Sequence, residues 1–78
     1  MDTQTELQDI TIGERAIVDA LHITGGMRRR LLDIGLVEGT LVECVGKAPS
    51  GNPIAFCIRG AVFALRREDC RNIHVRRL

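Results

Sequence analysis

Apolar and polar residues alternate over several short segments of the chain, which is the pattern of half-buried β-strands. In segment 15–21, Ala16, Val18 and Ala20 share one face, while Ile17 and Asp19 share the other. The same alternation predicts four more strands, at 41–47, 54–59, 61–65 and 73–75. Five short strands separated by turn signals predict a mainly β fold, a small five-stranded barrel.

A helical period replaces this alternation after the first strand. Three apolar residues form one stripe at helical spacing: Met27, Leu31 and Ile34. Thr24 is the predicted N-cap, because its hydroxyl can accept from a free N–H of the first turn. Gly35 fits the left-handed position just past the helix, with Leu36 folding back on Leu31. The segment therefore predicts one short helix inserted after the first strand.

Two smaller elements complete the predicted architecture. Turn residues at 48–53 indicate the tip of a hairpin, and 66–72 is interpreted as a single helical turn, typical of SH3-like barrels before the last strand. We expect a flexible tail at 1–6 and one domain at 7–78. The expected core comprises Leu7, Ile10, Ala16, Val18, Met27, Leu31, Ile34, Val42, Cys44, Ile54, Phe56, Ile58, Phe63, Leu65, Ile73 and Val75.

Composition favours one small cytosolic domain. The chain has 78 residues, 45% of them hydrophobic, but no apolar run near the roughly 18 residues that a membrane span needs. Its polar, acidic start is unlike a signal peptide. The three cysteines, Cys44, Cys57 and Cys70, form no CxxC pair, so they are predicted to be reduced, with only Cys57 on an outward face.

Charge is distributed unevenly, although the formal net charge is only +1. Acidic residues dominate 1–27, whereas arginines dominate the rest of the chain. On the helix, Arg28 and Arg29 flank Leu32 and crowd the end where the helix dipole disfavours cations. Two interpretations stay open: a solvated face offset by Asp33, or arginines displayed for a partner.

Several motifs, in order along 7–75, resemble the FeoA domain. The run from Gly26 to Leu36, followed by Gly39 and Thr40, resembles the core signature of that family. Further matches lie at 7–14, 48–53 and 65–68. Two positions depart from the pattern: Ser50 stands where an apolar residue is frequent, and Cys70 where alanine is usual.

The resemblance implies an SH3-like barrel and a cytosolic accessory protein of bacterial ferrous iron uptake. Its implied partner is FeoB, a membrane transporter with a cytosolic G-protein-like domain, so any membrane association would be peripheral. The candidate partner-binding residues lie on the helix (Arg28, Arg29 and Leu32) and at the hairpin tip (Pro49, Ser50, Gly51, Asn52 and Pro53). Exposed strand edges also leave a homo-oligomer open.

The sequence lacks the motifs of most catalytic and nucleic-acid-binding proteins. It has no Walker-type loop and no HExxH motif. It contains two phenylalanines but no tryptophan and no tyrosine. We therefore expect no catalysis, no cofactor and no proline-rich peptide groove. Alternatives are a nucleic-acid or transcription-linked FeoA-like module and a weak Fe²⁺ metallochaperone. For the latter, His22, His74 and Cys57 are candidate ligands, but spacing places no two of them together.

Overall fold

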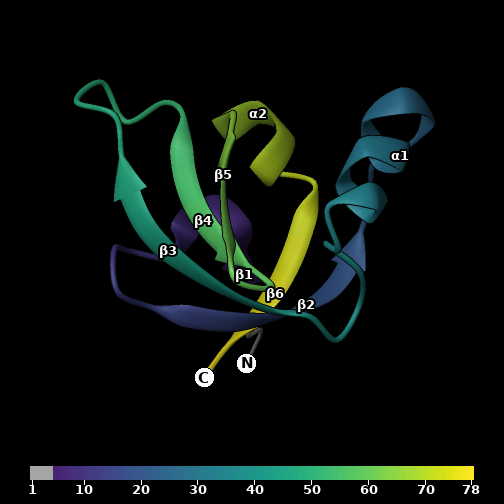
Figure 1. The fold of residues 1–78 in the computed structure, drawn as a ribbon, viewed down its shortest axis with the longest axis horizontal. Coiled ribbons are helices and arrows are strands. Elements are labelled where there is room, and N and C mark those ends of the chain that lie inside the picture. Colours follow the sequence, from purple (N-terminus) through teal and green to yellow (C-terminus); the bar gives the residue numbers. More distant parts are fainter. Residues whose placement is uncertain (1–4) are drawn as a thin grey trace.

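Antiparallel strands form a six-stranded, strongly curved sheet in the computed structural model, which describes residues 5–78 (Figure 1). The strands are β1 (Thr5–Glu6), β2 (Arg15–Leu21), β3 (Leu41–Lys47), β4 (Ile54–Ile58), β5 (Ala61–Leu65) and β6 (Ile73–Arg77). The helices are α1 (Gly25–Asp33), α2 (Arg67–Cys70) and the 3-10 helix η1 (Leu7–Asp9). The strand order is β1-β6-β2-β3-β4-β5, so β1 and β5 are edges and the sheet does not close into a barrel.

The predicted fold class is confirmed, with one strand more than expected. The chain is mainly β, and its longer helix follows the first long strand. Residues 1–4 of the predicted tail lie outside the described residues, but Thr5 and Glu6 form β1 opposite Val75 and His74. Strand β6 also runs two residues further than predicted, because Arg76 and Arg77 pair with β2.

The core lies inside the curve of the sheet and contains most of the predicted residues. Met27, Ile34 and Phe63 are corrections, because they are only partly buried against the core. Helix α1 stands to one side of the sheet (Figure 1), and Phe63 lies on an edge strand with one neighbour. Three further residues are buried in the core: Ile23, Leu36 and Cys70. The sequence indicated burial of Leu36, through its contact with Leu31, and of Cys70, but not of Ile23.

A β-bulge in β2 overturns one predicted face. The register between β2 and β6 shifts between Val18 and Ala20. Ala20 was predicted to point inward with Val18, but it is only half-buried and lies opposite His74, on the outer face. The extra residue reverses the alternation, so Ile23 beyond the strand end reaches the core instead.

Candidate functional site

Helix α1 ends as its sequence predicts. Gly35 has a φ of 94°, which only glycine adopts readily. The Gly35 N–H donates to the carbonyl of Leu32 at 3.0 Å, and the Leu36 N–H donates to that of Leu31 at 2.9 Å. This is the Schellman arrangement, with Leu31 and Leu36 both buried in the core. At the other end Thr24 is the N-cap residue, but the predicted hydroxyl cap is wrong, because its side chain makes no capping hydrogen bond.

The outer face of α1 presents the predicted arginines and Leu32 to solvent. Leu32 is 37% exposed, and both Arg28 and Arg29 are exposed. Arg28 Nη1 donates to the Leu21 carbonyl at 3.3 Å, which ties one arginine back to β2. Within residues 5–78, no ion pair joins Arg29 to Asp33. This face is therefore the basic surface that the sequence indicates.

The acidic N-terminal segment has different partners. Asp19 pairs with Arg76 at 3.1 Å. Glu14 lies 3.3 Å from Arg77. Glu14 also accepts from the Thr11 N–H at 2.7 Å, and this hydrogen bond, together with Arg77, lowers the pKa of its carboxyl. The acidic groups therefore offset the arginines of β6 and leave those of α1 available.

The predicted hairpin tip lies apart from α1. In Figure 1 the β3–β4 tip and α1 stand on opposite sides of α2, so the two candidate surfaces are not brought together. Within the tip, Ser50 Oγ donates to the Asn52 carbonyl at 3.0 Å. Asn52 Oδ1 accepts from the Arg67 N–H at 3.0 Å, at the start of α2. The Asn52–Pro53 peptide is cis. The tip therefore stabilises the start of α2 through this hydrogen bond.

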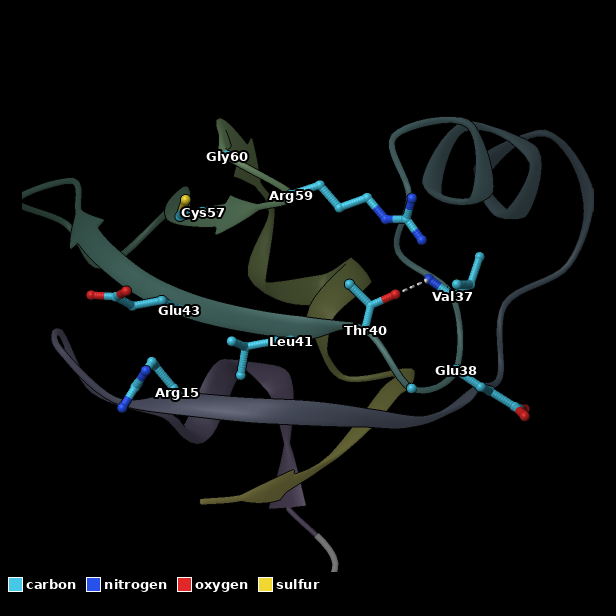
Figure 2. A pocket seen from close by; sticks show the side chains of 10 residues that line it. Arg15, Val37, Glu38, Thr40, Leu41, Glu43, Cys57, Arg59 and Gly60 are labelled. Carbon is cyan, nitrogen blue, oxygen red and sulfur yellow. Dashed lines mark hydrogen bonds between the residues drawn. The ribbon is translucent and has the colours of Figure 1, made fainter.

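An open depression of about 510 Å³ lies on the outer side of β3 and β4, beside the end of α1 (Figure 2). Its lining brings together two arginines, two glutamates, one thiol and the loop that follows α1: Arg15, Val37, Glu38, Gly39, Thr40, Leu41, Glu43, Cys57, Arg59 and Gly60. Arg59 extends from the β4–β5 turn toward Val37 (Figure 2). These groups can bind charged or mixed surfaces by electrostatic contacts.

Family-signature residues build the wall of this depression. Thr40 Oγ1 donates to the Gly35 carbonyl at 3.0 Å and accepts from the Val37 N–H at 3.4 Å. Its carbonyl accepts from the Val18 N–H at 2.9 Å, and the Gly39 N–H returns to the Val18 carbonyl at 2.8 Å. Gly39 and Thr40 therefore fix the end of α1 to β2.

A groove of about 450 Å³ between α1 and the β5–α2 segment was not predicted from the sequence. Its apolar lining includes Met27, Ile34 and Phe63, the three residues wrongly assigned to the full core. Charged residues stand at its rim: Arg30, Arg66, Glu68 and Asp69. The sequence pattern shows that α1 and β5 each carry apolar residues, but it does not show that these residues face each other across an open groove.

Two candidate metal ligands meet in the structure, contrary to the expectation from spacing. The imidazole rings of His22 and His74 lie with their centroids 4.6 Å apart. Cys57 is the accessible thiol, as predicted, while Cys44 and Cys70 are buried. Burial raises the pKa of Cys44, and it raises that of Cys70 to about 12. No cluster of three or more His, Cys, Asp or Glu residues suited to a metal ion occurs within residues 5–78.

These features define a small SH3-like β protein with exposed charged surfaces and a helix inserted after its first long strand. Comparison with known families then identifies it: the FeoA domain model matches residues 5–77, so the chain belongs to the FeoA domain family. In the part of the chain that the structure describes, no helix is long and apolar enough to cross a membrane.

Known relatives agree with this assignment. A Porphyromonas gingivalis protein, a fusion of Fe²⁺ transport protein A with the Fe²⁺ transporter FeoB, is 32% identical over 69 residues; these cover 88% of this chain and 8% of that protein. The solution structure of FeoA from Chlorobium tepidum is 34% identical, with a TM-score of 0.90 over 95% of this chain and 70% of that one. Stenotrophomonas maltophilia FeoA, a prokaryotic SH3-domain protein crystallised with zinc, is 29% identical, with a TM-score of 0.75 over 91% of this chain and 88% of that one.

Proposed function

We propose that this chain is a non-enzymatic accessory protein of bacterial ferrous iron uptake that docks on the cytosolic region of FeoB. The observation that carries the proposal is the P. gingivalis protein, in which a segment resembling 88% of this chain is joined covalently to FeoB. Fusion holds two domains at a high effective concentration, which is useful when they interact. The S. maltophilia relative is likewise discussed as a candidate activating factor for ferrous iron transport.

The outer face of α1 is the docking surface that the contacts favour. Leu32 offers an apolar centre, and Arg29 keeps its guanidinium free of ion pairs within residues 5–78. Arginine is common at interface hot spots, because its stem packs while its planar head binds carboxylates in a fixed geometry. A partner surface with acidic groups around an apolar pocket would match this face. Docking there would place the protein at the inner membrane without inserting it.

The hairpin tip is the second candidate surface for FeoB. Pro49 and Ser50 are exposed there, but Asn52 is engaged with α2. Substitution of Asn52, or of Ser50, which donates to the Asn52 carbonyl, would therefore disturb the tip, whereas a change at Pro49 would alter the surface alone. This difference makes the tip testable without confusing docking with stability.

Charge reversal on α1 tests the proposal. The double variant Arg28→Glu/Arg29→Glu should lose capture by the cytosolic region of FeoB under anaerobic conditions, and it should fail to restore ferrous iron uptake in a strain lacking the protein. Its thermal stability should fall only slightly, because exposed charge contacts contribute at most about 1 kcal/mol. Leu32→Ser should weaken capture without reversing any charge.

The matched control is Lys47→Glu/Arg71→Glu, two exposed cations on other elements. It changes the net charge by the same amount, so it should retain capture if the α1 face matters rather than overall charge. Normal capture and uptake by the α1 variant would exclude this face, and a Pro49 variant would then test the tip. Absence of any FeoB capture by the unmodified protein would refute the proposed function itself.

A further inference from the structure

Two histidines that are far apart in the sequence meet at one end of the sheet. His22 directly follows β2, and His74 lies on the outer face of β6, between the buried Ile73 and Val75. The bulged pairing sets Ala20 opposite His74, and the His22 N–H donates to the Asn72 carbonyl at 2.7 Å. Backbone hydrogen bonding therefore holds the two imidazoles together on a rigid part of the fold.

The separation of the rings suits joint binding of one metal ion. The centroids are 4.6 Å apart, and the ring planes make an angle of 65°. With metal–nitrogen distances of about 2.1 Å, two imidazoles on one ion have centroids roughly 4.5 Å apart at a right angle and about 5 Å apart at a tetrahedral angle. The observed centroid distance of 4.6 Å therefore lies within the range that two imidazoles on one ion adopt.

Neither imidazole is committed to another partner among the described residues. No side-chain hydrogen bond or ion pair within residues 5–78 engages either ring, and His74 Nδ1 is buried without a hydrogen-bond partner. A buried nitrogen left unpaired costs free energy that a bound ion or a new hydrogen bond would recover. Glu6 lies opposite His74 on β1, but its carboxylate accepts from Gln8 Nε2 at 2.9 Å and completes no metal cluster with the two histidines among residues 5–78.

We propose that His22 and His74 form a binding site for a first-row divalent transition-metal ion, with water at the remaining positions. No third protein ligand completes a cluster within residues 5–78, so the ion would be exchangeable rather than structural. Imidazole ligands favour Ni²⁺ and Cu²⁺ over Fe²⁺ in intrinsic affinity. The proposal does not rest on docking on FeoB, but the site adjoins the docking face, because Arg28 donates to the carbonyl of Leu21, the residue before His22.

Calorimetric titration of the tag-free protein with Ni²⁺ tests the site, and anaerobic Fe²⁺ provides a second arm. His22→Ala and His74→Ala should each weaken Ni²⁺ binding by at least roughly tenfold, since loss of an outer-shell partner alone costs about 10–100-fold. NMR signals of both imidazoles should broaden on addition of Ni²⁺. Cys57→Ser is the matched control, because it removes the accessible thiol and leaves both rings in place.

The outcomes separate clearly. Binding that survives the double variant His22→Ala/His74→Ala, or that disappears in Cys57→Ser alone, would overturn the proposal. So would the absence of heat and of imidazole broadening in the unmodified protein. His22 is exposed, so His22→Ala keeps the test valid even if His74→Ala perturbs folding. Fe²⁺ binding that is weaker than Ni²⁺ binding and lost in both histidine variants would support it.

Discussion

Alanine at position 35 would test the junction between α1 and the β4–β5 turn. Gly35 has a φ of 94°, and a Cβ at this position would lie 2.6 Å from Arg59 Cδ and 2.9 Å from Arg59 Nε. Two effects therefore combine in Gly35→Ala: an unfavourable backbone conformation and a collision with a side chain. Gly13 separates them, because it has a φ of 95° but a Cβ added there would meet no atom within 4 Å.

The expected magnitudes follow from these two effects. Left-handed backbone costs an L-residue about 1–2 kcal/mol, and the lower entropy of the unfolded alanine chain returns about 0.4–1 kcal/mol. Gly13→Ala should therefore lower stability by about 1 kcal/mol. Gly35→Ala should also force Arg59 from its rotamer, at about 0.5–1.5 kcal/mol, for a total near 2 kcal/mol.

Urea unfolding of both variants, alone and combined with Arg59→Ala, measures the difference. Removing the Arg59 side chain should reduce the cost of Gly35→Ala to that of Gly13→Ala, and it should leave the cost of Gly13→Ala unchanged. Equal losses for the two glycines, insensitive to Arg59→Ala, would show that Arg59 does not lie over Gly35. A loss below about 0.5 kcal/mol for Gly35→Ala, the range of ordinary surface changes, would refute the left-handed helix end as well.

Three further predictions concern the core, the thiols and acid stability. Ile58→Ala and Leu31→Ala should each cost about 2–5 kcal/mol in denaturant unfolding, and a loss below about 1 kcal/mol at both sites would contradict their inward register. Thiol labelling of the native protein should modify Cys57 first, since burial raises the pKa of Cys70 to about 12; equal rates would contradict the strand faces. The lowered pKa of Glu14 means that its stabilising effect is present above the ordinary value of 4.5 and is lost as the pH falls through the lower folded value. Glu14→Gln should therefore melt below the unmodified protein near neutral pH and converge with it in acid, and a constant difference would exclude this linkage.

Local signals account for what the sequence predicted well. The limits of β2, β3 and β5 match the predicted strands, because alternation and flanking turn residues act within a few positions. The end of α1 was predictable for the same reason, since Gly35 and Leu36 complete a motif whose hydrogen bonds span one helical turn. The FeoA signature covers this region, so the resemblance to the family and the helix-end pattern predict the same structure there.

The groove beside α1 depends on a distance that no local pattern encodes. A stripe such as Met27–Leu31–Ile34 shows which side of a helix is apolar, but not how closely another element approaches it. In the structure only Leu31 of the stripe is fully buried, so Met27 and Ile34 remain partly exposed opposite β5. Met27 and Ile34 were therefore predicted as core residues, although they line a surface groove.

The histidine pair was missed because of the bulge in β2. Strict alternation from Ala16 and Val18 would place Ala20 and His22 on the inner face, away from His74. The register shift between Val18 and Ala20 reverses this order and sets Ala20 opposite His74, two residues before His22. A bulge adds one residue to one strand and leaves no clear mark in the hydrophobic pattern, since Ala20 tolerates either face. If the bulge creates the site, deleting one residue between Val18 and Ala20 would remove both the altered register and the imidazole contact, whereas His22→Ala would remove the contact alone.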